Sequence, residues 1–270
     1  MKCTVTSILF LILMISAGIA EAGGAGVGIH SGYGVIKYDE HSVSMGSPIE
    51  SESSQDVILF GVSGEYSFSE LINFYAGITT DWAFGLKDIE TTKKDGIQIQ
   101  SNDMKIFSQF YDFRFGYKNS ARDYYYRLYV AGGWDGIHIK RDEFVLQGET
   151  VPGGIKEDFS LWRAGVGAGL GYTLNNWALD GRIAYAYYIS GEVKNGGMPQ
   201  YTFDTNGNCL DMGVGVLRKL TDKSSFYMGV SYTLLELDES EIIRSGLLEA
   251  VSPQSRTEIL TGVVNLNYSF

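Results

Sequence analysis

The C-terminal segment Ile259–Phe270 alternates apolar and polar side chains, which is the pattern of a strand with one apolar face. The apolar face comprises Leu260, Gly262, Val264, Leu266, Tyr268 and Phe270. Ends of soluble domains fray and bury little, so a half-apolar terminal strand that stops on an aromatic residue is unusual for them. The segment therefore favours a sheet that turns one face toward lipid, and it limits the possible folds more than any other stretch.

The N-terminal residues 1–22 have the three parts of a secretory signal peptide. Lys2 supplies the positive charge, Ile8–Ile15 is almost entirely apolar, and Ala20-Glu21-Ala22 fits a cleavage site between small residues. The apolar run is shorter than the roughly 20 residues that a membrane-spanning helix needs. The sequence therefore predicts export, with residues 23–270 forming a single domain.

Composition narrows the class of exported protein. The chain has 34 Gly, 18 Tyr and 14 Phe but only 4 Pro, and its mean hydropathy is -0.03. That is too polar for a bundle of transmembrane helices, yet rich in aromatic residues that favour strands. A formal net charge of -11 argues against nucleic acid as a partner. A closed barrel is the membrane architecture that remains, because it pairs every backbone group.

Dyad alternation recurs along the chain and predicts about ten strands, each long enough to cross a bilayer. Eight strands is the nearest alternative, and a soluble β-sandwich is the alternative outside the membrane. The expected strands are Ala25–Tyr38, Asp56–Phe68, Leu71–Phe84, Met104–Tyr117, Tyr124–Lys140, Asp158–Leu174, Trp177–Gly191, Asn206–Lys219, Ser225–Leu237 and Thr257–Phe270.

The connections between these strands alternate strictly between short and long. The short ones are Ser69-Glu70, Lys118–Asp123, Asn175-Asn176 and Leu220–Ser224, and the long ones are Asp39–Gln55, Gly85–Asp103, Arg141–Glu157, Glu192–Thr205 and Asp238–Arg256. Outer-membrane barrels have short periplasmic turns and long outer loops. The sequence therefore predicts an all-β, closed antiparallel transmembrane barrel with both termini periplasmic and five long outer loops.

Parity divides the side chains of these strands into an apolar set and a charged set. Outward positions such as Phe60, Leu128 and Val166 form a lipid-facing belt with aromatic residues at its rims. The opposite positions carry Glu65, Asp81, Asp112, Arg114, Arg127, Asp135, Arg163, Asp180, Arg182 and Asp211. A lipid-facing Arg at mid-depth costs roughly 2–4 kcal/mol, so these groups should face the lumen. We expect them to pair as an ionic lattice that plugs the barrel, with a polar passage or pocket as the alternative.

The strand layout resembles that of the omptin family of outer-membrane endopeptidases from about Tyr111 to the C-terminus. The segments that carry the resemblance are Asp112–Gly116 before a short turn, Tyr188–Val193 at the end of the seventh strand, and Leu266–Phe270. The final strand also resembles the C-terminal signature through which outer-membrane barrels are recognised and inserted. The resemblance is mainly architectural and implies a ten-stranded barrel.

Omptins are understood to activate water between an Asp-His couple in the fourth outer loop and an acidic pair in the second. Asp88 and Glu90 of the second long connection could stand in for the acidic pair, whereas the fourth contains no histidine. His41 and His138 are the remaining outward candidates for a general base. Because the fourth connection lacks the Asp-His couple, the resemblance does not imply endopeptidase activity for this chain.

Three functions therefore follow from the sequence. The first is a non-enzymatic surface barrel with a plugged polar lumen, whose loops serve adhesion, recognition or envelope integrity. The alternatives are an omptin-like endopeptidase with an altered active site and a narrow pore. No metal or cofactor is expected, because the histidines are scattered and Cys209 has no companion. The expected partners are outer-membrane lipid, lipopolysaccharide and, through the strand ending at Phe270, the barrel-assembly machinery. The expected location is the outer membrane of a Gram-negative bacterium, and the expected state is a monomer.

Overall fold

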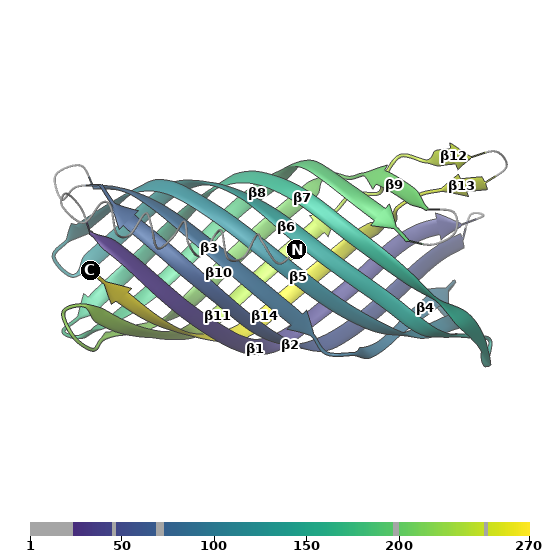
Figure 1. Ribbon diagram of the computed structural model, residues 1–270, viewed down its shortest axis with the longest axis horizontal. Helices are drawn as coiled ribbons and strands as arrows, with labels where there is room; N and C mark the ends of the chain where they lie inside the picture. Colours follow the sequence, from purple (N-terminus) through teal and green to yellow (C-terminus); the bar gives the residue numbers. More distant parts are fainter. Residues whose placement is uncertain (1–23, 45–46, 69–72, 197–199, 246–247) are drawn as a thin grey trace.

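The computed structural model describes residues 24–44, 47–68, 73–196, 200–245 and 248–270 (Figure 1). The predicted signal peptide, residues 1–22, lies outside these ranges. Within them, no helix is long and apolar enough to cross a membrane.

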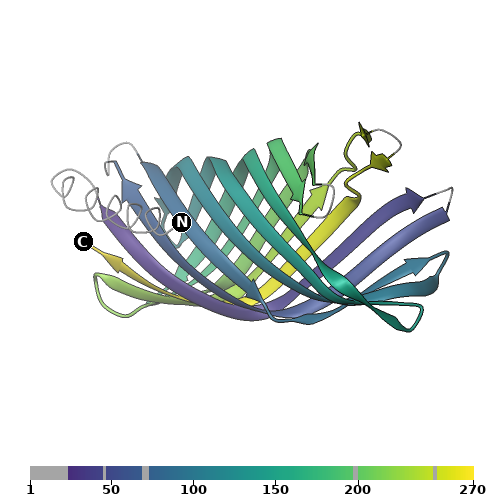
Figure 2. The same cartoon turned by 45° about the vertical axis from the view of Figure 1, so that its right-hand side comes forward.

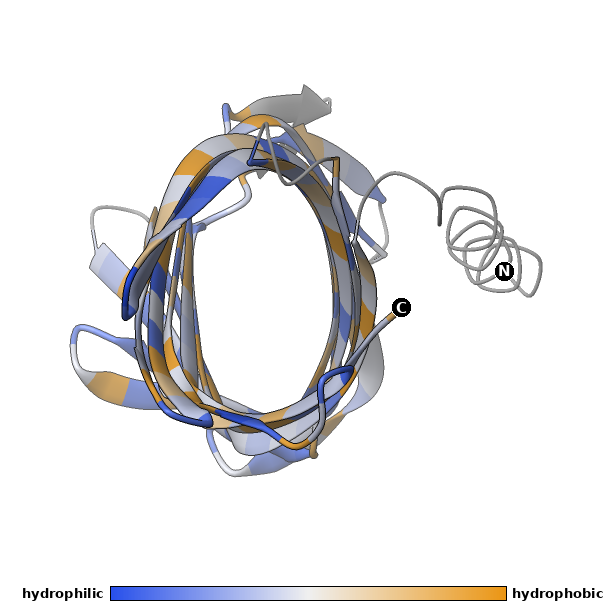
Figure 3. Ribbon diagram, turned by 90° about the vertical axis from the view of Figure 1, so that its left-hand side faces the viewer, coloured by the Kyte–Doolittle hydropathy of each residue, from blue (hydrophilic) through white to orange (hydrophobic). Residues whose placement is uncertain are grey.

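Ten strands form a closed antiparallel ring in the described part of the chain, in the order β1-β14-β11-β10-β8-β7-β6-β5-β3-β2, and β2 pairs with β1 to complete it. Viewed along its axis the ring is oval (Figure 3). The predicted strand number and closure are therefore confirmed. The ring strands are β1 (Ala25–Ser44), β2 (Ser47–Ser67), β3 (Phe74–Gly85), β5 (Ile97–Ala121), β6 (Tyr124–Leu146), β7 (Glu149–Leu174), β8 (Trp177–Asn195), β10 (Gly207–Lys219), β11 (Ser224–Leu237) and β14 (Gln254–Ser269).

Both described chain ends lie at the same end of the barrel as the short connections. The backbone N–H of Phe270 donates to the carbonyl oxygen of Ala25 at 2.9 Å, so the final strand is tied to the first. We call this end the short-turn end and the opposite one the long-hairpin end. Figures 1 and 2 show that the strands cross the barrel axis at a steep tilt between these two ends.

The connections expected to be long outer loops are largely extensions of the barrel wall. β1 and β2 continue as a hairpin into the predicted first loop, and β6 and β7 extend through the predicted third. In the second, β4 (Asp88–Lys94) pairs with both β2 and β5. Asp95 and Gly96 turn this hairpin with φ values of 52° and 77°, which suit a tight two-residue turn. In the fourth, β9 (Tyr201–Asp204) pairs antiparallel with the end of β8, while β12 (Ile243–Ser245) and β13 (Leu248–Ala250) form a separate hairpin in the fifth.

The polarity of the wall reverses along the barrel axis. In the short-turn half, outward side chains such as Val166 and Leu128 are exposed and apolar, between rims of aromatic side chains. Between the rim that contains Trp162 and the long-hairpin end, the inward side chains of β6 become apolar. Ile137 and Ile139 are buried, whereas Lys140, which follows them with the opposite parity, is exposed. The first arrangement suits a bilayer and the second suits water. The barrel therefore has a membrane-compatible half and a half built like a soluble barrel.

Candidate functional site

The short-turn half of the lumen contains a cavity of about 970 Å³, which we call the polar chamber. Its lining extends from Asn73, Ser120 and Ser269 at the short-turn end to Arg163 and Cys209 near the middle of the barrel. Of the lumen side chains expected from the sequence, those that line it are Glu65, Asp81, Asp112, Arg114, Arg127, Arg163, Asp180, Arg182 and Asp211. The ionic side chains therefore surround a space and do not fill it.

Three side chains of β6 lie across a row of glycines on β7 and shape one wall of the chamber. Tyr125, Arg127 and Tyr129 stand directly opposite Gly171, Gly169 and Gly167 in the ladder. A Cβ added at Gly167 would lie 2.3 Å from Cζ of Tyr129, and one at Gly171 would lie 2.0 Å from Cζ of Tyr125. Glycine here makes room for neighbouring rings.

This arrangement lets Arg127 reach over β7 to a carboxylate on β8. Its Nη2 lies 2.8 Å from Oδ2 of Asp180, and the hydroxyl of Tyr125 donates to the same oxygen at 2.6 Å. Nearby, Nε of Arg114 donates to Oδ2 of Asp112 at 2.6 Å. A charge buried without a partner is costly, and each of these pairs gives both of its charged members a partner.

A second group of ion pairs lies at the inner end of the chamber. Nε of Arg163 lies 3.0 Å from Oδ2 of Asp135, which is fully buried and accepts a hydrogen bond from Tyr188 at 2.7 Å. Nη2 of Arg163 lies 3.5 Å from Oδ1 of Asp112. The other chamber pairs are Arg182 with Asp211 at 3.3 Å, Lys118 with Glu65 at 2.7 Å, and His30 with Asp81.

Some polar atoms of the chamber have no hydrogen-bond partner within the described ranges. Among them are Nδ1 of His30, Nε of Arg127 and Oδ1 of Asn265. Each belongs to a residue that lines the chamber. A cavity of this size and polarity suits water, which can satisfy such atoms.

A cluster of buried side chains, most of them apolar, crosses the lumen in the long-hairpin half, and we call this cluster the apolar plug. Every strand of the ring contributes at least one of them, and each is at most 5% exposed. The plug comprises Ile36, Tyr38, Val57, Ala83, Met104, Ile106, Ile137, Ile139, Phe159, Leu161, Ala186, Tyr188, Val193, Phe203, Cys209, Leu235, Leu237 and Ile259. Because the walls meet here through packed side chains, the lumen of the described structure is divided into two parts.

Beyond the plug, one guanidinium holds three carboxylates together at the long-hairpin end, in a group that we call the arginine clasp. Arg141 of β6 donates to Glu90 of β4 at 2.7 and 3.0 Å, to Glu40 of β1 at 3.0 Å and to Glu157 of β7. The side chains of Arg141 and Glu90 are only 7% and 1% exposed. Since β1 and β6 are not neighbours in the ring, the clasp joins opposite walls across the lumen.

The clasp contains more negative than positive charge, and it lies outside the membrane-compatible half. Burial raises the pKa of the Glu157 carboxyl above its usual range, although Arg141 opposes this shift and Glu40 adds to it. Burial and Glu40 also raise the pKa of Tyr38 well above its usual range. The tyrosine hydroxyl donates to Glu40, so the clasp keeps Tyr38 neutral and favours a proton on Glu157.

The four residues proposed from the sequence as catalytic candidates do not converge. Glu90 points inward and is bound in the clasp, and Asp88 precedes it on the same strand. His41 is exposed near Glu50, at 3.9 Å. His138 faces the outside of the wall, where its Nδ1 lies 2.5 Å from Oδ1 of Asp158 and its ring stacks on Phe107. An Asp-His couple therefore exists, but on the opposite side of the wall from Glu90.

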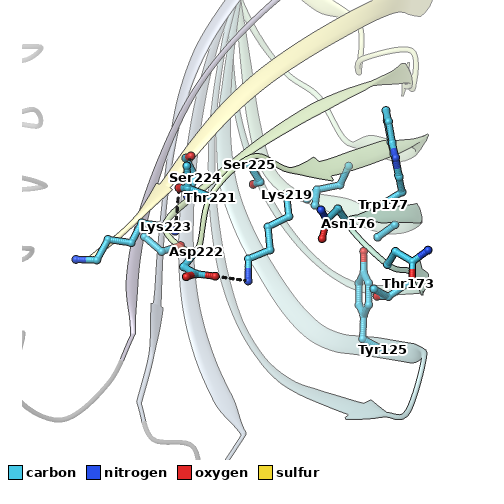
Figure 4. A pocket seen from close by; sticks show the side chains of 14 residues that line it. Tyr125, Thr173, Asn176, Trp177, Lys219, Thr221, Asp222, Lys223, Ser224 and Ser225 are labelled. Atoms are coloured by element: carbon cyan, nitrogen blue, oxygen red, sulfur yellow. Dashed lines mark hydrogen bonds and ion pairs between the residues drawn. The ribbon is translucent and has the colours of Figure 1, made fainter.

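A smaller cavity of about 330 Å³ lies at the short-turn end, between the β7–β8 and β10–β11 turns (Figure 4). Tyr125 and Trp177 border it on one side and the turn at Thr221–Ser224 on the other. Nζ of Lys219 lies 3.2 Å from Oδ1 of Asp222 within it. Both groups of this pair are largely exposed, and the cavity opens to solvent at the rim of the barrel.

The sequence identified Glu90 but not the residues that bind it. Glu40 lies in the connection predicted as the first long loop, and Arg141 and Glu157 lie in the one predicted as the third, so none of them was expected on a strand. The signal was present, because Ile137, Ile139 and Arg141 continue the inward parity of β6 that runs from Tyr125 through Asp135. Extending the alternation past the membrane would have placed Arg141 in the lumen.

Strands that close on themselves, an outward apolar belt between aromatic rims and a polar lumen together define the transmembrane β-barrel class. No family model and no curated protein matches the sequence. Among solved structures, the chain is similar to the outer-membrane protease OmpT from Escherichia coli, with a TM-score of 0.68 over 92% of this chain and 97% of that chain, at 9% identity. This confirms the predicted fold class and the omptin-like layout, and at this identity the similarity concerns the fold alone.

Two autotransporter barrels are also similar in part. The transport unit of AIDA-I from Escherichia coli has a TM-score of 0.44 at 12% identity, over 91% of this chain and 90% of that chain. The translocator domain of NalP from Neisseria meningitidis has a TM-score of 0.40 at 12% identity, over 98% and 96%. These scores are too low to add to the argument.

Proposed function

We propose that the chain is a non-enzymatic barrel of the outer membrane of a Gram-negative bacterium, with a lumen closed to solutes. In this proposal the short-turn end faces the periplasm, and the long hairpins present a surface for adhesion, recognition or envelope integrity. The observation that carries the proposal is the division of the lumen by the apolar plug. Supporting it, none of the three histidines meets Glu90 or Asp88.

The orientation is tested by placing one epitope at each end of the barrel. Inserted between Asp95 and Gly96, at the tip of the β4–β5 hairpin, the epitope should bind antibody on intact cells. Inserted at Arg122, in the short β5–β6 turn, it should bind only after the outer membrane is permeabilised. Antibody binding at Arg122 on intact cells would reverse the proposed orientation.

The omptin-like endopeptidase remains the alternative, favoured by the similarity to OmpT and by Glu90 at the long-hairpin end. Cells that display the chain should leave a panel of fluorogenic peptides intact, whereas cells with an active outer-membrane protease should cleave them. Cleavage that disappears in Asp88→Ala, His41→Ala or His138→Ala variants would establish the enzyme instead. Cleavage that persists in all three would point to contamination.

The proposed partners are outer-membrane lipid and lipopolysaccharide around the apolar belt, and the barrel-assembly machinery through the final strand. What supports the second partner is that Tyr268 near the end of β14 and Phe270 directly after the strand lie side by side and exposed, their ring centroids 5.3 Å apart. Phe270→Ala should lower the amount of assembled barrel in cells while leaving refolding of the purified chain into lipid unchanged. Equal assembly of variant and wild type in cells would remove this partner.

A further inference from the structure

We propose that the apolar plug, and not the ionic lattice, is the seal of this barrel. The sequence suggested that paired charges fill the lumen. In the structure these pairs surround a cavity of about 970 Å³ that extends to the short-turn end. A lining of ion pairs around water does not exclude ions.

The chamber ends where the plug begins. Arg163 and Cys209 line the inner end of the chamber, and Cys209 also belongs to the plug, where it is 2% exposed. Beyond it, Ile36, Ile106 and Leu161 are fully buried, on β1, β5 and β7. Together with Leu235 of β11, these side chains come from four well-separated positions around the ring and meet in its interior.

An apolar section stops ions even where it leaves small gaps. Moving an ion from water into apolar surroundings is very unfavourable, and apolar constrictions exclude water as well as ions. The polar chamber offers ions charged partners of both signs. The barrier to permeation therefore lies in the plug, and the chamber is a dead end entered from the short-turn end. This inference rests on the closed lumen of the proposed function and names the residues that close it.

The experiment compares three variants by single-channel recording in planar lipid bilayers. The plug variant combines Ile36→Ser, Ile106→Ser, Leu161→Ser and Leu235→Ser. The matched control changes the same positions to Ile36→Val, Ile106→Val, Leu161→Met and Leu235→Met. The lattice variant removes both members of one chamber pair, Arg127→Ser with Asp180→Ser, so that no unpaired charge is left. Before recording, the folding of each variant is checked by testing whether the protein resists unfolding by detergent in the cold.

Wild type, matched control and lattice variant should show no conductance steps, whereas the plug variant should show discrete steps. A folded plug variant that stays silent, or a lattice variant that conducts, overturns the assignment of the seal while leaving the closed lumen of the wild type intact. Conductance by the wild type has a different meaning, because it would overturn the closed lumen of the proposed function itself.

If the plug variant does not fold, a second measurement tests whether the plug excludes water. In a Cys209→Ser background, Ala83→Cys places a thiol in the plug and Ser231→Cys places one in the chamber. In the folded protein, a small sulfonated thiol reagent should modify the plug thiol at least about tenfold more slowly than the chamber thiol, because the plug must open locally before the reagent can reach it. Equal rates at the two positions would show that water fills the plug, and the proposal would fail.

Discussion

At the scale of single residues, the packing of Tyr129 on Gly167 gives a direct test of the chamber wall. A Cβ at position 167 would lie 2.3 Å from the ring, and the contacts are with ring atoms that are held by the opposite strand. Gly167→Ala should lower the free energy of unfolding by about 1–3 kcal/mol, the usual cost of overpacking. Urea unfolding of the barrel in lipid vesicles measures it.

The control is Gly181→Ala on β8, because the nearest atoms to its added Cβ are 3.9 Å away. That substitution should be neutral or slightly stabilising, since alanine restricts the unfolded chain more than glycine. Combining Gly167→Ala with Tyr129→Ser should cost less than the sum of the two changes. Additive costs would mean that the ring and the added methyl group do not meet.

The raised pKa of Glu157 predicts how stability depends on pH. The folded chain holds the proton more tightly than the unfolded chain, whose carboxyl titrates near 4.5. The free energy of unfolding should therefore fall as pH rises from about 4.5 through the folded pKa. Glu157→Gln, which mimics the protonated group, should lack this part of the decrease. Unfolding titrations of both proteins across this range measure the difference, and parallel curves would contradict the assignment.

At the scale of elements, the arginine clasp connects strands that share no ladder. Replacing Arg141 with Met leaves the carboxylates of Glu40, Glu90 and Glu157 close together without a cation. Removing one partner of a buried pair costs roughly 3–5 kcal/mol, so Arg141→Met should destabilise the barrel by that order. Amide exchange should quicken in β4 before it does in the chamber strands, because β4 lies nearest the lost contact.

Arg256→Met provides the matched control for Arg141→Met. Arg256 also contacts two carboxylates, Glu236 and Glu258, but its side chain is 47% exposed. Ion pairs in this position contribute about 0–1 kcal/mol, so the variant should unfold almost as the wild type does. Similar losses for the two variants would show that the clasp acts as an ordinary surface ion pair.

The elements themselves show where the sequence was informative. Within the membrane-compatible half, one face of each strand is apolar and the other charged, so parity and strand number could be read directly. The hairpin between Asp39 and Gln55 could not be predicted in this way, because most side chains on both of its faces are polar and the sequence shows no alternation there. Strong strand pairing without amphipathic patterning is recognisable only once the partner strand is known.

At the scale of the whole molecule, the same chain builds two barrels of opposite polarity on one set of strands. The sequence predicted the charged lumen of the first because hydrocarbon excludes charges from its outer face. It did not predict the apolar plug of the second. Ile137 and Ile139 alternate with His138 and Lys140 as in any half-buried strand, and the reversal of faces depends on where the membrane ends along β6.

This two-part architecture predicts that the same kind of substitution, Val to Arg, is costly on the outer face of one half and almost without cost in the other. Val166 lies on β7 midway between the aromatic rims at Tyr172 and Trp162, and is 62% exposed on the outer face. Val166→Arg should therefore cost roughly 2–4 kcal/mol in lipid, the penalty of a lipid-facing Arg at mid-depth. Val151→Arg, near the tip of the same strand, should cost almost nothing because water surrounds it.

The measurement is the folded fraction of each variant in lipid vesicles and in detergent micelles. Val166→Arg should fold less well than the wild type in vesicles but nearly as well in micelles, where water reaches the belt more easily. Val151→Arg should match the wild type in both. If the two variants lost the same amount in vesicles, the apolar belt would not be at mid-bilayer, and the bilayer would have to surround a different part of the barrel.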